Sequence, residues 1–144
     1  MPVAALVPTS ILRLLGDDTV HKKTGRKVDG AKSCRDAVRS TKNRVVYVWG
    51  LQIVLLCLEV QPPWGGEPLA LPINMRLYRK RPNKNSGKSI LDLMKEMLFK
   101  VREWFPTHRI YFVADGFYAP LAKDLPAEVF IISRIRHDAP FSRR

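Results

Sequence analysis

The spacing of apolar and polar residues along the chain predicts an alternation of strands and helices. Ile11–Leu15 is a short apolar run that stops at Gly16 and two aspartates, which is typical of a strand followed by a turn. Val45–Val60 is a longer apolar run rich in β-branched residues, and it predicts either one long buried strand or two pieces bent at Gly50. The run is shorter than a membrane-spanning helix requires, so we expect no membrane segment.

The middle of the chain predicts a turn, a strand and a helix in that order. The prolines and glycines of Gln61–Pro68 disfavour both helix and sheet pairing and predict a turn. Alternation resumes in Leu69–Lys80, which predicts a strand in which Pro72 marks an edge position or a bulge. Ser89 is expected to begin a helix, because it forms a capping-box pattern with Asp92 ahead of apolar positions at helical spacing.

Two further strands are predicted after this helix. Arg109–Asp115 is apolar and ends on a carboxylate, residues 116–125 predict a turn with a short helix, and Glu128–Arg136 predicts the last strand. Three consecutive strands favour an antiparallel meander, and a strand after each helix favours parallel pairing through right-handed crossovers. The pattern therefore predicts a single mixed α/β domain over residues 1–144, with the layout of a ribonuclease-H-like fold.

The charge of the chain changes this picture, because it is high and concentrated. Twenty-five Lys and Arg against thirteen Asp and Glu give a net charge of +12. His21–Arg44, expected to be a long loop, carries nine basic and two acidic residues, and Arg76–Lys88 carries six basic and none acidic. Two such segments indicate a surface for a polyanion, with a solvated face as the alternative. The candidate nucleic-acid contacts here are Lys22, Lys23, Arg26, Lys27, Arg79, Lys80 and Arg81.

The cysteines and tryptophans give weaker signals. Cys34 and Cys57 have no partners at zinc-site spacing, and two lone cysteines fit a reducing cytoplasm, with one thiol at the surface and one buried. Trp49 and Trp104 lie in apolar runs and are expected in the core. Trp64, in the turn, is expected to pack on the core, with stacking on a nucleobase as the alternative.

Asp17 and Asp115 are the candidate catalytic residues, because each follows a predicted strand. Ligands of open α/β sheets sit at strand ends near a switch in strand order. If the first and fourth predicted strands are neighbours, the two carboxylates converge and repel each other. Mg²⁺, or Mn²⁺ in its place, would remove this repulsion and also hold phosphate oxygens. The alternative is that each aspartate caps a turn or a helix.

The chain also resembles the DDE-type transposases of bacterial insertion sequences, in four stretches that occur in the family's order: GDDTVHKKTGRKVDG, the stretch from VVYVWG to MRLYRK, VADGFYA and SRIRHDAPF. The resemblance is to the DDE superfamily endonuclease domain. It implies that Asp17 and Asp115 bind the catalytic metals, with Asp18 as the fallback for Asp17. It also implies metal-dependent cleavage and transfer of DNA strands at transposon ends, and a homodimer in the intact family. Arg134 and Arg136 belong to an element expected near bound DNA.

The resemblance is incomplete at one position. The family's third carboxylate is a Glu on a helix downstream of the last strand, whereas this sequence ends at Arg144 and Glu128 lies too early to replace it. We therefore expect a ribonuclease-H-like catalytic domain that is incomplete at its C-terminus, with little or no strand transfer by itself. Two alternatives stay open: a DNA-binding remnant without catalysis, and an α/β interaction domain whose charge is incidental.

Overall fold

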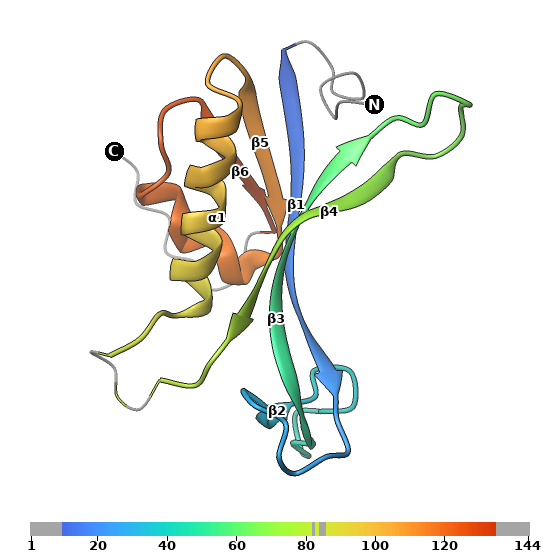
Figure 1. Ribbon diagram of the computed structural model, residues 1–144, viewed down its shortest axis with the longest axis vertical. Coiled ribbons are helices and arrows are strands. Elements are labelled where there is room, and N and C mark those ends of the chain that lie inside the picture. The colour runs from blue at the N-terminus through green and yellow to red at the C-terminus, as the bar shows by residue number, and fades with distance from the viewer. Residues whose placement is uncertain (1–9, 82, 84–85, 135–144) are drawn as a thin grey trace.

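A computed structural model describes residues 10–81, 83 and 86–134 of the 144-residue chain, and it forms a mixed α/β fold around a twisted six-stranded sheet (Figure 1). The strands are β1 (Ile11–Lys22), β2 (Lys32–Arg35), β3 (Tyr47–Val60), β4 (Leu69–Tyr78), β5 (Arg109–Ala114) and β6 (Val129–Ser133). The helices are α1 (Ile90–Trp104) and the 3₁₀-helix η2 (Gly116–Lys123). The strand order is β2-β3-β1-β5-β6, and β4 also pairs with β3.

The pairing of the strands follows the predicted plan. β1, β3 and β4 form an antiparallel meander, and β2 is a short addition to it on β3. β5 then pairs in parallel with β1 after α1, and β6 pairs in parallel with β5 after η2. The prediction of an antiparallel meander followed by helix, strand, helix and strand is confirmed.

Helix α1 begins and packs as its sequence predicts. The Ser89 side chain accepts a hydrogen bond from the Asp92 amide at 3.1 Å, and the Asp92 carboxylate accepts one from the Ser89 amide at 2.7 Å. This capping box satisfies backbone donors that have no partner inside the helix. The helix buries one apolar face, formed by Leu93, Met94, Met97, Leu98 and Val101.

The core lies between this helix face and one face of the sheet. Alternate residues of β1, β3 and β5 point towards α1 and are almost completely buried, among them Leu12, Leu14, Val54, Leu56, Leu58, Ile110 and Phe112. Side chains on the other face of the sheet are more exposed. Met75 of β4 is 61 % exposed and Ile132 of β6 is 52 % exposed. The apolar contacts that stabilise the fold are therefore concentrated on the face covered by α1 and η2.

The first strand is longer than the sequence predicts. β1 continues through Gly16 to Lys22, because Asp18–Lys22 pair with Gly50–Val54 of β3. Gly16 serves close packing, since a Cβ there would overlap the Phe112 ring and come within 2.9 Å of the Met94 methyl group. The two aspartates therefore lie inside a strand, and the prediction that the strand ends before them is wrong.

Residues 19–53, which we call the arm, form the part of the molecule that extends beyond α1 (Figure 1). The arm holds the outer ends of β1 and β3 and the short β2, which the sequence analysis treated as loop. β3 runs without interruption through Gly50, where a Cβ would approach the His21 carbonyl oxygen to 2.5 Å. The irregularity in pairing falls instead between Leu56 and Cys57, opposite the segment that contains Pro72, in agreement with the predicted bulge.

Several predictions about individual side chains are wrong. Trp49 and Trp104 are 43 % and 49 % exposed, because Trp49 turns towards the arm loop and Trp104 ends α1 beyond its buried face. Trp64 is 79 % exposed in the turn between β3 and β4. Cys34 and Cys57 are both buried and both are free thiols, so the prediction of one surface thiol is wrong.

Within the described part of the chain, neither helix is long and apolar enough to cross a membrane.

Candidate metal and nucleic-acid site

The two strands that carry the candidate aspartates are direct neighbours. β1 and β5 run parallel, and their register pairs Gly16 with Ala114. Asp17 follows Gly16 and Asp115 follows Ala114, so the two aspartates lie at the same level along the two strands. The condition that the sequence analysis set for convergence of the carboxylates is therefore fulfilled.

The adjacent acids Asp17 and Asp18 have different surroundings because strand side chains alternate between faces. Asp18 is half-buried on the face that η2 covers, where its Oδ1 accepts a hydrogen bond from the Tyr118 hydroxyl at 3.1 Å. Its Oδ2 accepts one from the Gln52 side-chain amide at 2.8 Å. Asp17 is exposed, and its Oδ1 accepts from the Asp18 backbone amide at 2.8 Å. Both oxygens of Asp18 are thus oriented by residues distant in sequence, and those of Asp17 are not.

Asp115 caps the 3₁₀-helix that follows β5. Its backbone is extended, and its Oδ1 accepts a hydrogen bond from the Phe117 amide at 2.9 Å. This is the capping role that the sequence analysis gave as the alternative. A carboxylate has about four lone-pair sites on two oxygens, so one capping bond leaves it able to bind a cation as well. The assignment of Asp17 and Asp115 as metal ligands stays a prediction.

Tyr118 connects the acidic residues. The side chain is fully buried, and it packs edge-on against the Phe112 ring. Burial is the main cause that raises the pKa of Tyr118 well above its ordinary value, followed by the charge and hydrogen bond of Asp18 and then the charges of Asp17 and Asp115. The hydroxyl therefore stays protonated and donates to Asp18, with three carboxylates close enough to act on it.

The oxygen donors of this region suit a hard cation such as Mg²⁺, which binds carboxylates and water. Among the residues described, no group of three or more His, Cys, Asp or Glu side chains is arranged to hold a metal ion. Glu128 lies at the opposite end of the β5–β6 pair, where it pairs with Arg109 at 3.0 Å. It adds no ligand to the aspartates, in agreement with the sequence analysis.

The two basic segments, which are remote in sequence, lie together at the end of the arm. Arg79 donates two hydrogen bonds to Asp29, at 2.9 and 2.6 Å, and so connects the end of β4 to the arm loop. Lys32 lies over the Tyr78 ring, 3.7 Å from its centroid. Burial is the main cause that lowers the pKa of Lys32, and the charge of Lys80 acts in the same direction.

The other candidate basic residues have various surroundings. Lys22 forms an ion pair with Asp36 at 3.5 Å, and the Lys23 amide donates to the Trp49 carbonyl. Lys27 and Arg26 are exposed in the arm loop. These positions place positive charge along the arm.

The remaining candidates lie outside the arm. Arg81 is half-buried beside Gly87, and its charge contributes to the lowered pKa of Asp92. Arg134 is exposed directly after β6. Arg136 lies outside the described residues. The structure therefore does not bring Arg134 into the basic end of the arm.

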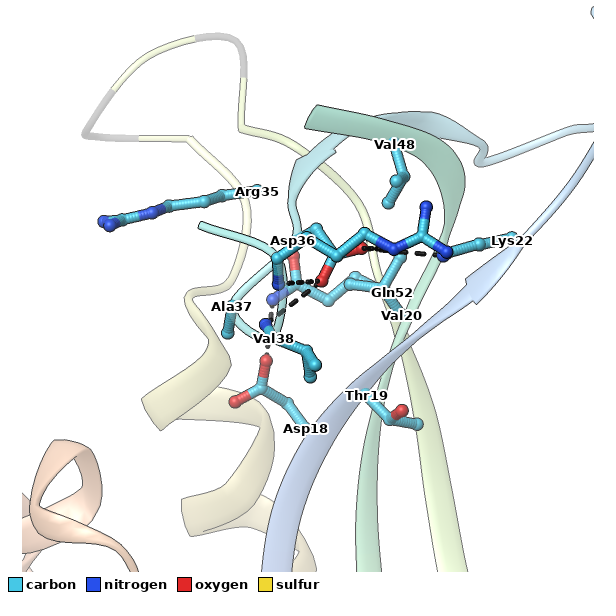
Figure 2. Close-up of a pocket in the computed structure, with 11 residues that line it drawn as sticks. Asp18, Thr19, Val20, Lys22, Arg35, Asp36, Ala37, Val38, Val48 and Gln52 are labelled. Carbon is cyan, nitrogen blue, oxygen red and sulfur yellow. Dashed lines mark hydrogen bonds and ion pairs between the residues drawn. The ribbon is translucent and has the colours of Figure 1, made fainter. Parts of the chain in front are cut away.

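A cavity of about 460 Å³ lies beside Asp18, between β1, β3 and the turn that follows β2 (Figure 2). Asp36 holds this turn, because its carboxylate accepts hydrogen bonds from the Val38 and Arg39 amides, both at 3.1 Å. Those two amides and the charge of Lys22 lower the pKa of Asp36, against the effect of burial. The cavity is lined by Asp18, Thr19, Val20, Lys22, Arg35, Asp36, Ala37, Val38, Arg39, Val48 and Gln52.

The sequence analysis missed the roles of Gln52 and Asp36 in this region, and it missed the contact of Tyr118 with Asp18. Tyr118 is 100 residues from Asp18 in the chain, and Gln52 is 34 residues away. The sequence signals were weak: Gln52 is an isolated polar residue in an apolar run, and Tyr118 is an aromatic residue three positions after Asp115.

Comparison with protein-family models, with curated proteins and with solved structures found no match.

Proposed function

We propose that this domain binds DNA and processes it with a divalent cation, as an endonuclease of the DDE transposase type. One observation carries the proposal: β1 and β5 are parallel neighbours in a register that pairs Gly16 with Ala114, so Asp115 lies level with the aspartates of β1, and the Tyr118 hydroxyl of η2 donates to Asp18. A carboxylate within β1 and one directly after β5 are a suitable donor set for Mg²⁺ in a site that must also accept phosphate. The antiparallel meander, crossover helix and parallel strands agree with a ribonuclease-H-like layout and support the proposal.

Asp18 is a better candidate than Asp17 for the first metal ligand. Its two oxygens are oriented by Tyr118 and Gln52, whereas Asp17 is exposed and bonds to its own neighbour's amide. Asp115 supplies the second carboxylate from the start of η2. A bound divalent cation would activate a water molecule and stabilise the leaving oxygen of a phosphodiester. The chain's own residues orient the carboxylates and, on the arm, attract the phosphates of the DNA backbone.

The arm supplies the DNA-binding part of the proposal. The basic segments converge through the Arg79–Asp29 pair and the contact of Lys32 with the Tyr78 ring, so positive charge from separate parts of the sequence can act on one ligand. Lys and Arg on such a surface release counterions from DNA, which gives binding a steep dependence on salt. The cleaved DNA strand would lie where the arm meets Asp18 and Asp115.

Isothermal titration with Mn²⁺ tests the metal site. We expect Asp18→Asn and Asp115→Asn each to weaken Mn²⁺ binding at least tenfold, because each removes one anionic ligand. Asp17→Asn is the matched control, since it removes the same charge one residue away, and we expect it to weaken binding less than threefold. Equal Mn²⁺ affinities of the unaltered protein and the Asp18→Asn, Asp115→Asn double variant would exclude the metal site.

A second function, DNA binding without catalysis, is favoured by one observation. Both oxygens of Asp18 and one oxygen of Asp115 already accept hydrogen bonds from the protein itself. A non-catalytic domain would bind duplex DNA in EDTA with a steep salt dependence, while supercoiled plasmid would stay intact with Mn²⁺ present. Affinity that does not change with ionic strength would argue against both functions and favour a protein-interaction domain.

A further inference from the structure

The cavity beside Asp18 has one apolar side and one charged side. Val20 of β1, Val48 of β3 and Val38 of the turn after β2 supply the apolar side. Val38 is 95 % exposed and so is accessible to a ligand. A volume of about 460 Å³ is within the range of about 300–1,000 Å³ that is usual for sites of small organic ligands.

The charged side carries more positive than negative groups. Lys22 and Arg39 share one carboxylate, that of Asp36, at 3.5 and 3.9 Å, and Asp36 is only 8 % exposed. Asp36 also accepts two backbone hydrogen bonds, so its charge is already distributed over four donors. Arg35 has no carboxylate partner among the described residues, and it extends away from Asp36 in Figure 2. An anionic group of a ligand would thus find cations that are not fully neutralised.

Asp18 lies at the boundary of this cavity and contributes a negative charge to it. Both oxygens of Asp18 already accept hydrogen bonds, from Gln52 and Tyr118, which fixes the carboxylate in place (Figure 2 shows Asp18 and Gln52). A ligand in the cavity would therefore lie next to the residue that we assign to the first metal position. A single strand of DNA that runs from the arm to Asp18 and Asp115 would pass this cavity.

A ligand that fits must combine an anionic group with a flat apolar part. A nucleotide has this combination, because its phosphate can pair with Lys or Arg and its base can pack on aliphatic side chains. We infer that the cavity binds one unpaired nucleotide of the DNA strand, with the phosphate at Lys22 and Arg39 and the base against Val20 and Val48. This inference rests on the proposed function and adds one property to its DNA substrate. The bound nucleotide must be unpaired, because a base can enter a pocket only after it leaves the duplex stack.

The test measures a mononucleotide in the absence of divalent cations. Deoxyadenosine monophosphate is titrated in EDTA into the full chain carrying ¹³C-labelled valine methyl groups. We expect saturable shifts of the Val20, Val38 and Val48 methyl signals. Deoxyadenosine and inorganic phosphate, each of which lacks one half of the ligand, should bind at least tenfold more weakly. If inorganic phosphate binds as tightly as the nucleotide, the cavity is a simple anion site and the inference is wrong.

Two variants and a control locate the binding. Arg39→Ala should weaken nucleotide binding at least fivefold, and Val38→Trp should abolish the shifts of the Val20 and Val48 methyl signals, because an indole at this exposed position would fill the cavity without disturbing the core. Arg13→Ala is the matched control, since Arg13 is an exposed arginine of β1 that pairs with Glu59 outside the cavity. It should leave the affinity unchanged within twofold. An equal loss in Arg13→Ala and Arg39→Ala would show a general effect of charge and overturn the assignment.

The two proposals fail in different ways. Mn²⁺ binding that depends on Asp18 and Asp115, together with no valine shifts on adding the nucleotide, would refute the nucleotide pocket and leave the metal-dependent function in place. Saturable nucleotide binding without any Mn²⁺ binding would refute the metal site. In that case the cavity would belong to a non-catalytic DNA-binding domain.

Discussion

The two halves of the long β1–β3 pair differ in what stabilises them. Residues 11–16 and 54–60, which we call the packed half, lie against α1, and Leu12, Leu14 and Val54 there are fully buried. In the arm, only the side chains of Cys34 and Asp36 are less than a tenth exposed. The same two strands therefore pass from a hydrophobic core into a region ordered by hydrogen bonds and ion pairs.

The difference explains where the candidate site lies. Charged groups are costly to bury without partners, so the face of the packed half that contacts α1 has none, and the pair Arg13–Glu59 lies on the other face, whereas the arm holds many. Asp17 and Asp18 occupy the first positions after the packed half, where the core supplies rigidity and the arm supplies positive charge. A site at this boundary combines fixed carboxylates with access for a large polyanion.

The largest expected effect separates the two halves by stability. Leu14→Ala should lower the free energy of unfolding by about 3 kcal/mol, because it leaves a cavity in a fully buried position of β1. Val20→Ala, in the half-buried arm section of the same strand, should cost about 1 kcal/mol or less. Urea unfolding followed by circular dichroism measures both. Equal losses would show that the arm is as tightly packed as the core.

A smaller effect concerns the response of the arm to acid. The pKa of Asp36 is lowered in the folded protein, so its ionised form stabilises the turn above the ordinary aspartate pKa of about 4. This contribution is lost as the pH falls through the lowered folded value. Below pH 4, we expect the protection factors of the Val38 and Arg39 amides, which compare the exchange rate with the intrinsic rate at the same pH, to fall while those of the packed-half amides of β1 stay high.

Asp36→Asn is the control for this experiment. An amide oxygen can still accept the two backbone hydrogen bonds, but it does not titrate, so the difference in protection factor between pH 7 and pH 3 at Val38 and Arg39 should disappear. Asp92, which caps α1, has a pKa lowered by Ser89 and should titrate in both proteins. An unchanged protection factor at Val38 in the unaltered protein at pH 3 would contradict an electrostatic role for Asp36.

The smallest expected effect is a gain in DNA affinity. Asp29→Asn removes the carboxylate that occupies Arg79, and it should raise duplex affinity a few-fold and steepen the dependence of log affinity on log salt by about 1. Fluorescence anisotropy at several salt concentrations measures this. Asp124→Asn, which breaks an exposed pair with Lys95 beside α1, is the matched control. An equal gain in both variants would mean that net charge alone, rather than the arm, determines affinity.

Much of the fold could be predicted because its signals are local. The capping box of Ser89 and Asp92, the apolar spacing along α1 and the bulge at Pro72 each depend on residues close in the chain. The end of β1 could not be predicted in this way. Gly16 looks like a strand breaker by itself, and only the Phe112 ring packed against it shows that a glycine is required inside the strand.

The sequence by itself determined the order of the elements, the concentration of basic charge and the presence of acids beside two strands. Tertiary structure decided which of these acids face the same partners. It brought Tyr118 to Asp18, joined the basic segments through Arg79 and Asp29, and formed the cavity behind Asp36. The physical reason is the period of a strand: adjacent residues point to opposite faces, so a site depends on contacts between segments that local pattern does not specify.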